Sequence, residues 1–174
     1  MKYRRVFNSG ASHFFTLVTA KQQPLFLDED AVCLFADAIR HAMKSQPFIQ
    51  DAFVIMPDHI HCIWSLQQGD KDFSARWHLI KSWFSKKSRS LGIDAACWQP
   101  HYREHCLRDD KDYQQHVEYI HYNPVRHGLV ESPWAWPYSS FKHYVALGLY
   151  QHNWGSGRLW LPDSVGNEPA GIRR

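Results

Sequence analysis

The sequence predicts an α+β fold in which helices pack on an antiparallel sheet. Strand-like and helix-like segments follow one another along the chain, and two of the strands are joined by a two-residue turn that favours a hairpin. The 174 residues are 44% hydrophobic and 15% aromatic, which is enough for one domain with a substantial core. We expect this domain to occupy residues 1–150. Residues 151–174, which contain many Gly, Pro and Asn residues, are expected to form a loosely ordered tail.

The predicted elements follow in the order strand, helix, two strands, helix, strand, helix. They are expected at residues 13–20, 28–45, 53–56, 59–66, 73–91, 97–107 and 108–122. The first helix has an acidic first turn and a cationic last turn, which suits the helix dipole. The last helix is expected to end before Pro124, because proline disfavours helical backbone at the preceding residue.

Positive charge is concentrated on the helix predicted at 73–91. The formal net charge is only +3, so composition alone does not indicate a nucleic-acid partner. The helix interleaves Trp and Phe with cations, and Arg4 and Arg5 open the chain. Its cations are Arg76, Lys81, Lys86, Lys87 and Arg89. Such a mixture suits single-stranded nucleic acid, because bases stack on aromatic rings and phosphates pair with cations. An amphipathic helix with an aromatic core side and a solvated basic side explains the pattern equally well.

The cysteines and the apolar runs indicate the compartment. Cys33, Cys62, Cys97 and Cys106 stand far apart without a C-x-x-C pair, which argues against a zinc knuckle and against a disulfide framework. We expect them to be reduced thiols. No run approaches the roughly 18 consecutive apolar residues of a membrane span, and the N-terminus lacks an apolar secretory segment. The sequence therefore predicts a soluble, cytoplasmic protein.

Two histidines lie one residue apart in the strand predicted at 59–66. Because side chains alternate along a strand, His59 and His61 should share one face, while the apolar residues between and after them take the other face and the core. Two imidazoles about 6.5 to 7 Å apart along a strand can grip a metal ion from two sides. The alternative is a pair of ordinary half-exposed histidines in a His-rich chain.

Tyr119 and Asn123 are one turn apart on the helix predicted at 108–122 and just beyond it. Tyr113, Val117 and Ile120 form its apolar stripe, so Tyr119 and Asn123 should lie together on one flank, outside the core. A hydroxyl and an amide oxygen at positions i and i+4 can address one site. The alternative is a surface tyrosine and a helix-ending asparagine.

Most of the chain resembles one family. In order, it contains YRRVF, HFFTLVT, PFIQDAFVIMPDHIHCIW, DFSARWHLIKSWF, WQPHYREHCLRDDKDYQQHVEYIHYNPVRHGLV and WPYSSFKHYVALGLY. These blocks, from Tyr3 to Tyr150, resemble the REP-associated tyrosine transposases, a branch of the single-tyrosine HUH transposases. The resemblance implies a ferredoxin-like or RRM-like antiparallel sheet with helices packed on it and the HUH motif on a central strand. It assigns that motif to His59, Ile60 and His61.

The same resemblance implies roles for the helix residues. Tyr119 corresponds to the nucleophile and Asn123 to the third metal ligand, where related insertion-sequence enzymes carry a longer Gln. The implied function is that of a metal-dependent single-stranded DNA endonuclease and strand transferase, which acts at REP-type hairpins through a 5′-phosphotyrosine intermediate. Mg²⁺ or Mn²⁺ is the expected cofactor. We expect the partner to be single-stranded DNA with palindromic hairpins, the protein to be a monomer or weak dimer, and its location to be cytoplasmic and nucleoid-associated.

Two other functions remain open at this level. One is a non-catalytic protein that binds hairpins in single-stranded DNA on the same scaffold. The other is a metal-dependent hydrolase, which would need a carboxylate base; Asp58 is adjacent in sequence but should point to the other strand face. No base for the tyrosine follows from the sequence, because His116 and His121 are better explained as solvated helix histidines.

Overall fold

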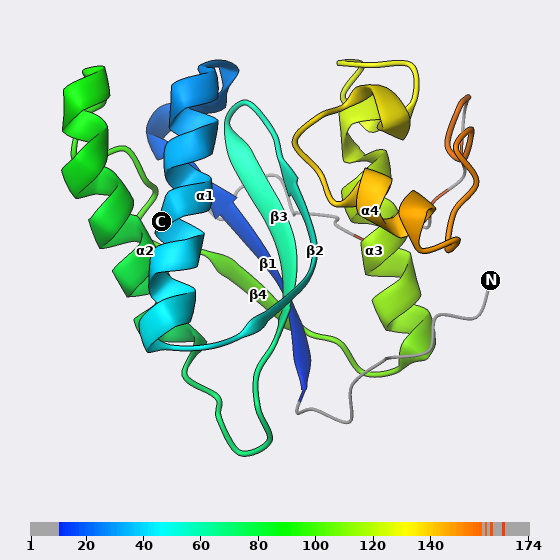
Figure 1. Ribbon diagram of the computed structural model, residues 1–174, viewed down its shortest axis with the longest axis horizontal. Coiled ribbons are helices and arrows are strands. Elements are labelled where there is room, and N and C mark those ends of the chain that lie inside the picture. Colours follow the sequence, from blue (N-terminus) through cyan, green and yellow to red (C-terminus); the bar gives the residue numbers. More distant parts are fainter. Residues whose placement is uncertain (1–10, 158, 160, 162–164, 166–174) are drawn as a thin grey trace.

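A four-stranded antiparallel sheet forms the centre of the protein (Figure 1). The computed structural model describes residues 11–157, 159, 161 and 165. The strands are β1 (Ser12–Val18), β2 (Ile49–Ile55), β3 (His59–Ser65) and β4 (Arg103–Cys106), in the order β2-β3-β1-β4. Helix α1 (Glu29–Ser45) connects β1 to β2, and α2 (Phe73–Lys87) connects β3 to β4. This is the ferredoxin-like βαββαβ topology. The predicted α+β fold is confirmed, and the strand that carries both histidines is central.

Helices cover both faces of the sheet (Figure 1). On one face α1 and α2 pack over Ile60, Cys62 and Trp64 of β3, and the Trp64 ring stacks on Trp77 at a centroid distance of 3.9 Å. On the other face lie α3 (Asp110–Arg126) and the short α4 (Phe141–Ala146), which pack over a second apolar cluster that includes Ile63. The alternation of side chains along β3 was therefore predicted correctly. The face that carries the histidines is buried as well, because α3 covers it, and the sequence pattern did not predict this.

Several boundaries differ from the prediction. Strand β2 begins at Ile49 rather than at Phe53, and β4 is confined to Arg103–Cys106. Helix α3 continues through Pro124 to Arg126. A proline this near the C-terminus costs one intrahelical hydrogen bond and no more than the last turn. The backbone N–H of His127 and that of Leu129 then close the end on the carbonyls of Asn123 and Pro124, at 3.0 and 2.9 Å.

The residues after α3 cover the outer edge of β2. The backbone N–H of Ile55 donates to the Tyr138 carbonyl at 2.8 Å, and that of Ser140 donates to the Phe53 carbonyl at 3.0 Å. The N–H of Phe53 donates to the Ser140 hydroxyl, also at 3.0 Å. Ser140 is also the N-cap residue of α4, a helix that was not predicted from the sequence. The outward-facing hydrogen-bonding groups of β2 are thus satisfied between Phe53 and Ile55.

The beginning of the predicted tail contacts the domain. The Trp154 ring packs on Tyr150 at 4.5 Å, and the Tyr122 hydroxyl donates to the Gly157 carbonyl at 3.0 Å. The domain boundary at residue 150 stays a prediction. All four cysteines are free thiols. Within the described part of the chain, no helix is both long and apolar enough to cross a bilayer.

Candidate catalytic site

His59 and His61 form a pair at the start of β3, on the face that α3 covers. Their ring centroids are 4.8 Å apart with an angle of 72° between the ring planes. His61 is 1% exposed, and it lies opposite Thr16 in the β1–β3 pairing. His59 is the first residue of β3 and directly follows the Pro57-Asp58 turn.

Each histidine uses its Nδ1 atom within the protein. The Asp58 carboxylate lies 2.6 Å from Nδ1 of His59, and the Thr16 hydroxyl lies 2.8 Å from Nδ1 of His61. The hydrogen bond from His59 lowers the pKa of Asp58, so this carboxyl group is ionised at neutral pH. Burial lowers the pKa of His61 well below its ordinary value, which keeps that imidazole neutral. Nε2 is the other nitrogen of each ring, and that of His59 points toward α3.

The expectation that Asp58 points away from the histidine face is wrong. Asp58 precedes β3 and belongs to the turn, so the alternation of the strand does not govern its side chain. Its backbone carbonyl accepts a hydrogen bond from the Thr19 N–H at 2.9 Å and lies 3.0 Å from the Thr19 hydroxyl, which also reaches the Gln23 carbonyl at 2.7 Å. These contacts hold the turn so that the carboxylate reaches His59.

Asn123 approaches the pair from α3. It is fully buried, and its Oδ1 atom lies 3.4 Å from Nε2 of His59. Its Nδ2 atom is buried without a hydrogen-bond partner among the described residues. With its proton on Nδ1 toward Asp58, His59 presents a lone pair at Nε2, next to the lone pairs of the amide oxygen. An ion between these two atoms would be held by both. The donor set therefore fits a divalent metal ion.

Tyr119 lies one turn before Asn123 and is 4% exposed. Its ring stands edge-on to His61 at 5.3 Å, and the Arg126 guanidinium lies over the ring at 5.5 Å from its centroid. Tyr119 contacts His61 and Asn123 contacts His59, so both face the histidine pair, but the prediction that both lie on a flank outside the core is wrong. Helix α3 lies directly on the sheet, so its buried side is wider than the three-residue apolar stripe.

Tyr122 and His121, the two residues that precede Asn123 on α3, are turned away from the histidine pair. The hydroxyl of Tyr122 is bonded to the backbone of Gly157 and Leu159, so Tyr122 points away from Asn123 as predicted. His121 is buried against Ser140, with Nε2 at 2.8 Å from the hydroxyl, and burial lowers its pKa to about 3. The interpretation of this histidine as a solvated residue is wrong.

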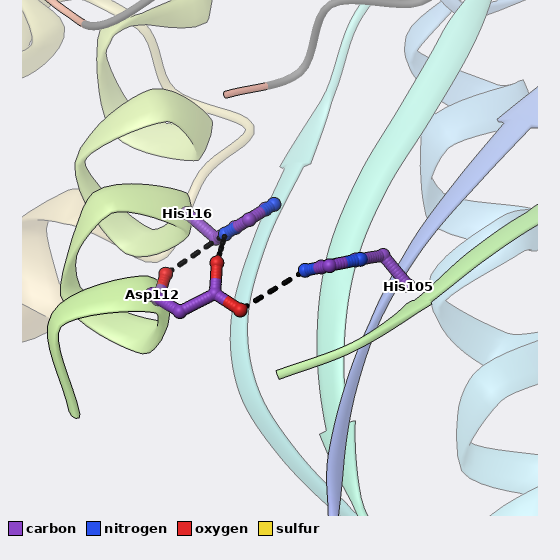
Figure 2. A group of neighbouring side chains, drawn as sticks. All are labelled: His105, Asp112 and His116. Carbon is purple, nitrogen blue, oxygen red and sulfur yellow. Dashed lines mark hydrogen bonds and ion pairs between the residues drawn. The ribbon is translucent and has the colours of Figure 1, made fainter. Parts of the chain in front are cut away.

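His116 belongs to a second group of side chains with metal-ligating chemistry (Figure 2). His105 from β4 and Asp112 and His116 from α3 have ligand atoms that all lie within 4.8 Å of one another. The interpretation of His116 as a solvated histidine is also wrong, because it is buried in this group. A spacing of i and i+4 between Asp112 and His116 on a helix was the sequence signal for it.

Hydrogen bonds involve most of the atoms in this group that could ligate a metal ion. The Asp112 carboxylate accepts from His105 at 3.0 Å and from the Arg108 backbone N–H at 3.1 Å, and Arg108 Nε lies at 3.3 Å. Nδ1 of His116 lies 2.8 Å from the Asp112 carbonyl, an acceptor, so this nitrogen carries the proton and offers no lone pair to a metal. The group has the composition of a metal site. Its hydrogen bonds, however, indicate a structural role, in which His105 and Asp112 connect β4 to the N-terminal turn of α3.

The cations assigned to DNA contact differ in their surroundings. Arg76 is 5% exposed and is bonded to Asp70 at 2.7 Å and to the carbonyls of Gln46 and Pro47 at 3.2 and 2.9 Å. Its guanidinium joins α2 to the segment between α1 and β2. We therefore remove Arg76 from the proposed DNA-binding residues, as a correction to the sequence prediction.

The remaining cations lie on the far side of the sheet from α3 or beyond the described residues. Lys81 donates to the Gln99 carbonyl at 2.8 Å, and burial lowers its pKa. Lys86, Lys87 and Arg89 are exposed at the end of α2 and just after it. Helix α2 covers the sheet face opposite α3 (Figure 1). Arg4 and Arg5 lie outside the described residues.

Helix α3, which carries Tyr119 and Asn123 one turn apart, lies over the histidine pair on the central strand of a ferredoxin-like sheet, which is the arrangement that the resemblance to single-tyrosine HUH transposases implies. Comparisons agree. The chain is 40% identical to the REP-associated tyrosine transposase of Escherichia coli (strain K12) over 153 residues, which are 88% of this chain and 90% of that protein. A relative from Haemophilus influenzae is 36% identical over 163 residues, with 88% of this chain and 92% of the relative covered.

A solved structure of a REP-associated tyrosine transposase bound to a REP hairpin matches with a TM-score of 0.75 and 37% sequence identity. The match covers 92% of this chain and 99% of that one. No family model matches the sequence. On this identity and coverage, the chain belongs to the family of REP-associated tyrosine transposases.

Proposed function

We propose that this protein binds single-stranded DNA at REP-type hairpins and cleaves and rejoins it through Tyr119. The observation that carries the proposal is the convergence of Tyr119 and Asn123 from α3 on the two histidines of β3. The relative that is bound to a REP hairpin, at 37% identity, supports the same DNA partner for this chain.

The chemistry is an exchange of phosphate esters. The Tyr119 oxygen forms a bond to the phosphorus of a phosphodiester while the bond from phosphorus to the 3′ oxygen breaks. The phenol loses its proton and the departing 3′ oxygen gains one, which leaves a 5′-phosphotyrosine and a free 3′-hydroxyl. Attack by another 3′-hydroxyl reverses the step and rejoins the strand. Because one ester replaces another, no nucleotide energy source is required.

His59, His61 and Asn123 would hold a divalent ion beside Tyr119, through two imidazole nitrogens and one amide oxygen. Mg²⁺ or Mn²⁺ bound there would neutralise charge on the phosphate oxygens in the transition state. The protein contributes the orientation of these ligands and a buried setting. The Arg126 guanidinium over the Tyr119 ring adds positive charge on the side of the nucleophile.

The test is covalent trapping on labelled single-stranded REP hairpins with Mn²⁺. Tyr119→Phe, which keeps the ring that packs on His61, should bind the hairpin with wild-type affinity and form neither cleaved strand nor adduct. Tyr122→Phe is the matched control on the same helix and should retain both. Peptide mass spectrometry then locates the link. An adduct on any residue other than Tyr119 contradicts the proposed nucleophile, and hairpin binding without any adduct leaves only the binding function.

Metal dependence is tested with the same substrate. His59→Ala, His61→Ala or EDTA should abolish cleavage while hairpin binding survives. Asn123→Ala should have a milder effect if water replaces the amide oxygen. Cleavage at the wild-type rate in EDTA would exclude the metal role.

A further inference from the structure

The two nitrogens of His59 face different partners. Nδ1 lies 2.6 Å from a carboxylate oxygen of Asp58, and Nε2 lies 3.4 Å from the amide oxygen of Asn123. A carboxylate only accepts hydrogen bonds, so the proton of a neutral imidazole belongs on Nδ1. The lone pair then lies on Nε2, toward α3.

Asp58 is itself held in place from the end of β1. Its backbone carbonyl accepts from the backbone N–H of Thr19, which is fully buried, and lies 3.0 Å from the Thr19 hydroxyl. That hydroxyl also lies 2.7 Å from the Gln23 carbonyl, so its one proton is shared between two acceptors. The Thr19 N–H can bond there because β1 ends at Val18, opposite His59 in the β1–β3 pairing. The backbone of Asp58 is therefore held at the end of β1 by contacts that do not involve the histidine.

We propose that Asp58 is a positioning residue, whose carboxylate holds His59 with its proton on Nδ1 and presents the Nε2 lone pair to the metal ion beside Asn123. The inference rests on the proposed function, because it concerns the same metal site. A hydrogen bond from a carboxylate to the outer nitrogen of a ligating histidine fixes the ring orientation and the tautomer and strengthens metal binding.

The two histidines are not equivalent in this respect. The partner of His61 is the Thr16 hydroxyl at 2.8 Å, and a hydroxyl can both donate and accept. Thr16 fixes the orientation of the His61 ring but not its tautomer. Loss of the Asp58 carboxylate should therefore alter the tautomer of His59, whereas Thr16→Val should alter that of His61 less.

The first measurement is the long-range ¹H–¹⁵N NMR spectrum of the histidine rings in the metal-free protein. Wild type should show His59 protonated on Nδ1, and Asp58→Ala should move the proton toward Nε2. Asp37→Asn is the matched control, because Asp37 is an exposed carboxylate paired with Arg40 on the opposite side of the sheet. It should leave the spectrum of His59 unchanged. Retention of the Nδ1 proton in Asp58→Ala overturns the proposal.

The second measurement is Mn²⁺ affinity by calorimetry. Asp58→Ala should weaken binding by about 10- to 100-fold, with Asp37→Asn at the wild-type value. A lower melting temperature with an unchanged affinity and tautomer would mean that Asp58 serves the turn alone, and would also overturn the proposal. If Asp58→Ala does not fold, Asp58→Asn decides, and it must bind Mn²⁺ more weakly than Asp37→Asn.

The two proposals fail in different ways. Wild-type protein that binds no Mn²⁺ contradicts the metal part of the proposed function, and the NMR spectrum alone then judges the role of Asp58. Wild-type binding of Mn²⁺ with unaltered affinity in Asp58→Ala supports the metal site and rejects its positioning by Asp58.

Discussion

Acidification should destabilise the protein through His121, which is fully buried beneath α4. Its Nε2 atom bonds to the Ser140 hydroxyl at 2.8 Å, and Nδ1 lies 3.3 Å from the Tyr150 hydroxyl. Burial lowers its pKa to about 3 in the folded protein, whereas an unfolded histidine titrates near pH 6.5. Between these two values the unfolded chain binds a proton that the folded protein excludes.

The sign and the size of the effect follow from this difference. A histidine whose folded pKa is depressed contributes full stability above pH about 6.5 and loses it as the pH falls. Each pH unit below that point costs about 1.4 kcal/mol, so His121 should lower the free energy of unfolding by about 2 kcal/mol between pH 6.5 and pH 5. Below pH about 3 its contribution should no longer change.

Urea unfolding at pH 7.5 and pH 5.0 measures the effect. His121→Asn should be less stable at both values, because it leaves Ser140 and Tyr150 without the imidazole, but its loss between them should be smaller than in wild type by about 2 kcal/mol. The other buried histidines contribute equally to both proteins and cancel in the difference. His78→Asn, on the exposed side of α2, should keep the wild-type loss. An equal loss in His121→Asn and wild type would refute the reasoning.

Three further outcomes are expected. His105→Ala should leave Mn²⁺ affinity and adduct formation unchanged, and weaker Mn²⁺ binding would instead identify the second histidine group as a metal site. Arg76→Met should lower the free energy of unfolding by about 1–3 kcal/mol, because backbone carbonyls lose their donor, without changing hairpin affinity in a filter-binding assay; weaker binding would return this residue to the DNA surface. The double substitution of Lys86 and Lys87 by Gln should reduce the slope of log affinity against log salt by about one unit for each lost phosphate contact, and an unchanged slope would place the DNA elsewhere.

The periodicity of the strand explains why half of the site could be predicted from the sequence. His59 and His61 share a face because the side-chain period of a strand is two, and that holds whatever packs on the face. The i and i+4 spacing of Tyr119 and Asn123 is equally local. Such relations depend only on the chain near the residues, so they survive folding unchanged.

Contacts between distant segments could not be predicted in this way. The burial of Tyr119 follows from α3 lying on the second face of the sheet, and no pattern within α3 shows which face it covers. Asp58 belongs to a turn, where side-chain direction follows from the hydrogen bonds of Thr19 rather than from alternation. Arg76 looked like a surface cation because its acceptors at Gln46 and Pro47 come from another part of the chain.

The cover over β2 limits how this protein can associate with itself. An outer strand with open N–H and C=O groups invites another chain to extend the sheet, by dimerisation or by aggregation. Here the backbone between Phe53 and Ile55 is already bonded to Tyr138 and Ser140. A second copy could add a strand along this stretch only by displacing the segment that leads into α4, so this stretch resists edge-to-edge growth.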